Sequence, residues 1–313
     1  MDSLRSITLV LALTIVTATP RQALAATPAV DPKASYDALR KRVAADLKQG
    51  KPLVATVYVA LCDNNQIACG SSALGNGDKP RRNLYWGGAA GLRAFFDYRR
   101  RRWKRVFLDG GDGKVVLERA VYRMRIRRPS LSWRRLGVTK GFDVYLIALA
   151  YRGQHIAKAM GALIRDVSAE PKSSSTLTLK KGGVTLPLGA AGHLVGYAGH
   201  NHLMDVTSYA WPRFTRRTPL GFFALACMTA PYLGPRLARR GSPALLLTRT
   251  LMYPGAFTIE GLLRAFAGGG DQRAVFRGGA DAYAHYQKRP KARIRYVFTY
   301  DARRSFAKRY GKR

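Results

Sequence analysis

The stretch that decides the fold is Gly192–Cys227, which reads GHLVGYAGHNHLMDVTSYAWPRFTRRTPLGFFALAC. It contains two continuous apolar runs, His193–Ala198 and Leu220–Ala226, each about as long as a buried strand. Such runs are typical of strands buried on both faces of a parallel sheet. His200 follows the first run closely, and Cys227 directly follows the second. Because ligands and reactive groups gather beyond the carboxyl ends of parallel strands, we expect an imidazole and a thiol to share one edge of the sheet.

Outside this stretch, strand-like and helix-like segments alternate along the chain. The further expected central strands are Leu53–Cys62, Phe142–Ala150 and Pro243–Thr248, and Arg293–Tyr300 is expected as a last edge strand. The expected helices are Asp31–Gly50, Asn83–Arg100, Gly153–Val167, Thr258–Phe266 and Asp271–Lys288. This alternation predicts an α/β fold with a mostly parallel central sheet flanked by helices.

Two antiparallel hairpins are expected as insertions into this fold, at about residues 103–135 and 173–189. The first places Gly110-Gly111-Asp112-Gly113 between two β-like runs, and the second turns at Gly182-Gly183. We therefore expect one α/β domain over residues 26–302, followed by a basic tail at residues 303–313.

The first 25 residues have the features of a secretory signal peptide. Arg5 precedes an apolar run from Ile7 to Ala18, and Ala23-Leu24-Ala25 forms a small-residue cleavage site. The run is too short to span a bilayer, and no later stretch is long and apolar enough for a transmembrane segment. We expect an exported protein, periplasmic or secreted; a buried N-terminal helix is the alternative.

The three cysteines fit an oxidising compartment. Cys62 and Cys69 are close enough in sequence to pair as a loop disulfide, which would leave Cys227 as the odd, reactive thiol. The alternative is that all three are buried or free.

A Cys/His dyad is the chemistry that these residue types favour. The imidazole of His200 would control the protonation of the thiol, and the thiolate of Cys227 would be the nucleophile. Each residue also has a structural interpretation: Cys227 as a small buried apolar side chain, and His200 as a loop residue bonded to nearby backbone.

The pattern of a strand ending in His just after Gly, then a strand ending in Ala-Cys before small residues, resembles the caspase-like cysteine peptidases, which include legumains, gingipains and caspases. The resemblance implies a caspase-like fold, an endopeptidase acting on a peptide or protein substrate, and no cofactor. It matches His200 to the catalytic His, Ala226-Cys227 to the nucleophile block, and Thr229 to the small residue beyond it. The family usually has Gly after the His, where this chain has Asn201.

The same sheet edge is expected to carry the residues that line the site. Backbone N–H groups at Cys227 and around Gly199 and Asn201 would stabilise an oxyanion. Asp63 and Asn64 follow the first central strand, so we expect them near the substrate side chain.

A zinc site is an alternative to the Cys227/His200 dyad. His193, His200 and His202 lie close in sequence, and Asp205 would add a carboxylate. The segment shows no firm third ligand, so we expect no metal.

The chain is strongly basic, with a formal net charge of +36. Arg and Lys residues are scattered in pairs, which favours either an Arg-rich solvated surface or the binding of a polyanion such as nucleic acid, envelope phosphate or acidic glycan. The alternative to a peptidase is therefore a secreted cationic binding protein with the same fold and no enzymatic activity.

Overall fold

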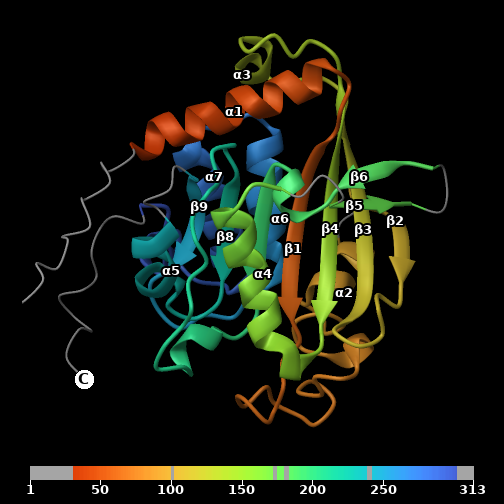
Figure 1. Ribbon diagram of the computed structural model, residues 1–313, viewed down its shortest axis with the longest axis vertical. Coiled ribbons are helices and arrows are strands. Elements are labelled where there is room, and N and C mark those ends of the chain that lie inside the picture. Colours follow the sequence, from red (N-terminus) through yellow and green to blue (C-terminus); the bar gives the residue numbers. More distant parts are fainter. Residues whose placement is uncertain (1–30, 100–101, 172–174, 180–182, 238–241, 302–313) are drawn as a thin grey trace, which may run out of the picture.

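The computed structural model describes residues 31–99, 102–171, 175–179, 183–237 and 242–301, and its central feature is a large sheet (Figure 1). Over these residues the sheet has 8 strands, in the order β10-β9-β8-β7-β1-β4-β3-β2. The strands β9, β8, β7, β1 and β4 pair in parallel, whereas the pairings of β10, β3 and β2 are antiparallel. The expected α/β fold with a mostly parallel central sheet is confirmed.

The strand bounds agree with the continuous apolar runs in the sequence. The strands are β1 (Leu53–Ala60), β2 (Lys104–Asp109), β3 (Val116–Ile126), β4 (Phe142–Tyr151), β7 (Leu194–Ala198), β8 (Gly221–Leu225), β9 (Ala244–Thr248) and β10 (Phe298–Thr299). Every residue of β1, β7, β8 and β9 is buried. Apart from the buried Thr56 and Thr248, these four strands are apolar, because helices or loops cover both faces of the sheet.

Helices cover the two faces of the sheet unequally. The helices are α1 (Pro32–Lys48), α2 (Leu92–Tyr98), α3 (Leu131–Arg134), α4 (Ile156–Ser168), α5 (Thr229–Leu237), α6 (Ala256–Ala267), α7 (Gln272–Tyr286) and α8 (Lys291–Arg295), with short 3-10 turns at Pro80–Arg82, Gly153–His155, Gly189–Ala191 and His202–Met204. One core cluster joins α1, α2, α6 and α7 to residues such as Ala55 and Val57 of β1. The other joins α4 and α5 to Val54 and Tyr58, which point to the opposite face.

The helix expected over Asn83–Arg100 is wrong in its first half, because the helix α2 begins only at Leu92. The buried Asn83 side chain instead holds the backbone of Cys62, accepting from its N–H at 3.0 Å and donating to its carbonyl at 2.7 Å. A Cβ at Gly87 would lie 1.9 Å from the carbonyl oxygen of Arg81, so the chain turns too tightly here for a helix.

The first hairpin is an extension of the sheet rather than a separate insertion. β2 and β3 pair with each other, and β3 continues onto β4 with Ile126 opposite Phe142. The turn is held by Asp112, whose carboxylate accepts from the backbone N–H groups of Lys114, Val115 and Val116. The second hairpin, β5 (Thr176–Thr178) and β6 (Thr185–Pro187), forms a small sheet of its own, and residues 180–182 of its turn lie outside the described residues.

The expected edge strand Arg293–Tyr300 is mostly wrong, because α8 occupies Lys291–Arg295 and only Phe298–Thr299 pairs with β9. The expected signal peptide and basic tail lie outside the described residues. Within the described ranges, no helix has the length and apolar character needed to cross a membrane.

Candidate active site

The parallel pairing of β7 with β8 sets the relative position of His200 and Cys227. Ala198 lies opposite Leu225, so each of the two site residues comes two positions beyond a paired residue. The ladder continues past the strands, because the Gly199 N–H donates to the Leu225 carbonyl at 3.1 Å. Neighbouring strands lie about 4.8 Å apart. The chain therefore leaves the same edge of the sheet at His200 and at Cys227, after two neighbouring strands.

Cys227 is the free cysteine of the described residues, and its side chain is partly exposed. Cys62 and Cys69 form a disulfide, as the sequence suggested. The Sγ of Cys227 lies 3.7 Å from the Met252 carbonyl oxygen. The next residue, Met228, has a φ of +54°, which is uncommon for a residue other than glycine. This conformation ends the strand abruptly, and α5 begins one residue later.

Asp205 holds the imidazole of His200. The Nε2 atom lies 2.9 and 2.8 Å from the two carboxylate oxygens, and the side chain is 11% exposed. An ionised carboxylate only accepts hydrogen bonds, so Nε2 carries the proton. In the neutral ring, Nδ1 then keeps a lone pair that can take a proton.

Asn201 connects the two strand ends. Its Nδ2 donates to the Cys227 carbonyl at 2.7 Å, its Oδ1 accepts from the Leu203 N–H at 3.2 Å, and the residue is completely buried. The side chain that stands where the resemblance expects Gly is therefore a brace between the His-bearing and Cys-bearing loops.

The other residues expected to line the site have structural contacts. Thr229 is fully buried, and its hydroxyl donates to the Ala224 carbonyl at 3.1 Å, which holds the start of α5 against β8. Asp63 packs against Gly153 beyond β4, on the side of β1 away from β7. Asn64 accepts from the Cys69 N–H at 3.0 Å within the disulfide loop. No described contact brings Asp63 or Asn64 to Cys227.

Tyrosines that sequence reasoning missed lie close to the thiol. Burial raises the pKa of Tyr85, and the charge of a Cys227 thiolate adds to that rise. Burial also raises the pKa of Tyr283, with a smaller contribution from the same thiolate. The Tyr283 hydroxyl accepts a hydrogen bond from the Tyr253 N–H at 3.2 Å. Tyr85 and Tyr283 come from distant segments, so no local sequence signal identifies them.

The histidines do not form a metal site. His193 lies at the amino end of β7, at the opposite end of that strand from His200. Its Nδ1 accepts from the Val54 N–H at 3.1 Å, and its Nε2 lies 3.1 Å from Asp46. Among the described residues, no group of three or more His, Cys, Asp or Glu side chains is placed to hold a metal ion.

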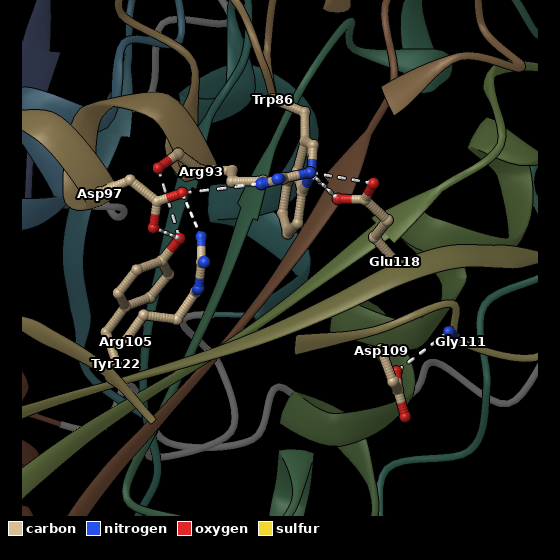
Figure 2. Close-up of polar contacts among 8 residues, drawn as sticks. All are labelled: Trp86, Arg93, Asp97, Arg105, Asp109, Gly111, Glu118 and Tyr122. Carbon is tan, nitrogen blue, oxygen red and sulfur yellow. Dashed lines mark hydrogen bonds and ion pairs between the residues drawn. The ribbon is translucent and has the colours of Figure 1, made fainter. Parts of the chain in front are cut away.

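A second polar cluster lies between α2 and β3 (Figure 2). Glu118 accepts from the Trp86 Nε1 at 2.7 Å and pairs with Arg93 at 2.8 Å. Asp97 accepts from the Tyr122 hydroxyl at 3.1 Å and pairs with Arg105. The two acidic side chains neutralise the two arginines. Because Arg93 and Asp97 belong to α2 and Glu118 and Tyr122 to β3, these contacts tie α2 to the sheet.

A cavity of about 470 Å³ opens beside α6 and α7, lined by residues that include Glu260, Arg277 and Tyr286. None of its lining residues comes from the ends of β7 or β8. It is therefore separate from the candidate active site.

Comparison with known proteins finds no matching family model, no similar curated protein and no similar solved structure.

Proposed function

We propose that this chain is an exported cysteine endopeptidase of the caspase-like type, with Cys227 as nucleophile and His200 as acid/base. The observation that carries the proposal is the register of two neighbouring parallel strands, in which Ala198 lies opposite Leu225. This register supports a thiol and an imidazole at matched positions on one edge of the sheet.

The chemistry follows from these two groups. His200 Nδ1 takes the thiol proton, and the Cys227 thiolate attacks the carbonyl carbon of the scissile peptide bond. The resulting imidazolium gives its proton to the leaving amine as the carbon–nitrogen bond breaks, leaving a thioester. His200 then takes a proton from water, whose oxygen attacks the thioester, and the imidazolium returns the proton to the departing Cys227 sulfur.

Two further contacts support this arrangement. Asp205 fixes the orientation of the His200 ring, as the third member of a nucleophile, base and acid set does. Asn201 holds the backbone of Cys227 relative to the loop that carries His200. Because the backbone of Cys227 is held in this way, the site needs little reorganisation when the substrate binds.

The test is the rate at which iodoacetamide alkylates Cys227 of the folded protein between about pH 6 and pH 7, where an ordinary thiol is mostly protonated. We expect the wild-type protein to react faster than a model thiol. We expect His200→Ala to lower the rate by about tenfold or more, because the thiolate is the reactive form.

The matched control is His202→Ala, which removes a histidine two positions away, and we expect it to leave the alkylation rate unchanged. Equally slow labelling of the wild-type protein and His200→Ala would contradict the peptidase proposal. If His200→Ala and His202→Ala both lost the fast alkylation, the loop that carries them, rather than the imidazole of His200, would control the reactivity of the Cys227 thiol.

The charge of the chain favours a second candidate function, the binding of a polyanion through the basic surface. The sequence has 54 Lys and Arg residues against 18 Asp and Glu residues, so most basic side chains have no acidic counterpart. This function predicts retention on heparin that falls steeply with salt. The peptidase proposal does not require such retention.

A further inference from the structure

The segment between β3 and β4, residues 127–141, forms a closed lobe that concentrates positive charge. Its sequence, RRPSLSWRRLGVTKG, contains five basic residues and no acidic residue. Its two ends meet, because Ile126 pairs with Phe142 and Gly141 packs against the carbonyls of Ile126 and Arg127. We call this segment the basic lobe.

Buried contacts fix the basic lobe on the body of the protein. Trp133 is completely buried, and its Nε1 donates to the Ala267 carbonyl at 2.8 Å. The Arg40 guanidinium lies 4.9 Å from the centroid of the Trp133 ring, and it donates to the Ser132 hydroxyl at 2.7 Å. Ser130 accepts from the Trp133 N–H and caps α3. The lobe is therefore packed against α1 and the carboxyl end of α6.

The basic lobe carries exposed charges that no carboxylate of the described residues neutralises. Its five basic side chains are exposed, and none of them has an acidic partner within the described residues. These residues are Arg127, Arg128, Arg134, Arg135 and Lys140. Lys48 of α1 lies against Gly137 and adds a sixth charge. Asp143, at the start of β4, pairs with Arg123 and Arg125 at 3.0 and 3.4 Å.

Leu131 distinguishes this patch from a purely electrostatic surface. It is 64% exposed, between Arg127-Arg128 and Arg134-Arg135. An exposed apolar side chain flanked in the sequence by two pairs of arginines fits the boundary between lipid headgroups and acyl chains. A surface for single-stranded nucleic acid would instead offer aromatic rings for stacking, but the ring of Trp133 is buried.

We infer that the basic lobe docks the protein on an anionic phospholipid surface, with Leu131 inserted below the phosphates and the arginines among them. This inference rests on the second proposed function, polyanion binding, and is independent of the peptidase chemistry. Figure 1 shows α3 at the end of the molecule opposite the arrowheads of β1 and β4. Docking through α3 would therefore leave His200 and Cys227 facing away from the membrane.

The test measures partition of the protein into vesicles of phosphatidylcholine and into vesicles that also contain phosphatidylglycerol. We expect the wild-type protein to bind only the anionic vesicles. Arg134→Gln with Arg135→Gln should weaken this partition roughly 10- to 30-fold, since each basic residue near the surface adds a several-fold factor. Leu131→Ser should weaken it several-fold and make the remaining binding more sensitive to salt.

The matched control removes two exposed arginines, Arg289→Gln with Arg293→Gln, beyond the carboxyl end of α7. The amino end of α7 lies near the lobe, because Gly269 contacts Ser130. The 15 residues of α7 span about 22 Å, so the control changes net charge equally but far from the lobe. We expect the control to change partition less than about twofold.

The outcomes separate the proposals. Equal losses in the lobe and control variants, or no binding of the wild-type protein to anionic vesicles, would overturn the inference. Loss of DNA retention in the lobe variant with unchanged vesicle partition would assign the lobe to nucleic acid instead. Absence of heparin retention together with absence of binding to anionic vesicles would refute polyanion binding as a whole, whereas heparin retention without vesicle binding would overturn only the membrane inference. Cys227→Ala should bind vesicles as the wild-type protein does, whatever its effect on peptidase activity.

Discussion

At the scale of single residues, His193 is a buried histidine whose environment favours the neutral ring. Nδ1 accepts from the Val54 N–H, so Nε2 carries the proton and donates to Asp46. Burial lowers the pKa of His193, with a smaller contribution from Arg42, although Asp46 opposes the change. Protonation of Nδ1 would remove the hydrogen bond that this atom accepts from the Val54 N–H.

This environment predicts a loss of stability in mild acid. The unfolded chain takes up a proton on His193 near its ordinary pKa of about 6.5, whereas the folded protein does so only at lower pH. The free energy of unfolding should therefore be highest above about pH 6.5 and fall as the pH drops below that value. Urea unfolding at a series of pH values measures the slope.

The matched variant is His193→Gln, whose amide offers one acceptor and two donors but does not titrate. We expect it to flatten the slope below about pH 6.5 while Asp46, whose pKa the His193 hydrogen bond lowers, still titrates at more acidic pH. His193→Ala should cost about 1–3 kcal/mol at neutral pH, because it leaves buried polar groups unpaired. An unchanged slope in His193→Gln would mean that another group controls the acid response.

Residues of the candidate site differ in how far the sequence could predict them. That His200 and Cys227 follow two neighbouring strands could be predicted from two apolar runs, because parallel strands bring their carboxyl ends to one edge. The brace from Asn201 to the Cys227 carbonyl could not be predicted, since it depends on the paths of two loops. Tyr85 comes close to the thiol only because Asn83 pins the preceding loop to Cys62.

At the scale of elements, the contact between β7 and β8 depends on a residue without a side chain. Gly196 lies opposite Phe223, and a Cβ on Gly196 would lie 2.2 Å from two carbons of the Phe223 ring. We expect Gly196→Ala to push the two strands apart and to destabilise the protein by about 1–3 kcal/mol. The midpoint of urea unfolding measures the change.

The matched control is Gly110→Ala, because a Cβ at Gly110 meets no atom within 4 Å. That substitution should change the free energy of unfolding by less than about 0.5 kcal/mol. If Gly196→Ala were as stable as the control, the strands would have room to adjust and the Phe223 ring would not set their spacing.

Elements also show where sequence patterns stop being informative. The central strands were predictable because strands buried on both faces are mostly apolar, and β1, β7, β8 and β9 are buried at every position. The segment before α2 has apolar residues at helical spacing, yet Asn83 and the close packing of Gly87 commit it to a turn. At the C-terminus, a run that resembles a strand forms α8 instead, because only Phe298 and Thr299 reach β9.

At the scale of the whole molecule, the net charge of +36 sets a condition on stability. Like charges on a folded surface repel one another, and the compact state brings them closer than the unfolded chain does. Salt screens this repulsion, because the Debye length falls from about 30 Å at 0.01 M to about 10 Å at 0.1 M. Ion pairs such as Arg295 with Asp281, at 2.9 Å, are screened too, but acidic residues are too few for such pairs to dominate.

The melting temperature should therefore rise with ionic strength, by about 2–4 °C for each kcal/mol of repulsion removed. Thermal unfolding followed by circular dichroism at low and physiological salt measures this rise. A variant with Gln in place of Arg127, Arg128, Arg134 and Arg135 should melt higher at low salt and respond less to added salt, because its basic lobe has lost most of its charge. A melting temperature that falls as salt is added would mean that ion pairs outweigh repulsion, and the basic surface would then be a source of stability rather than a cost retained for binding.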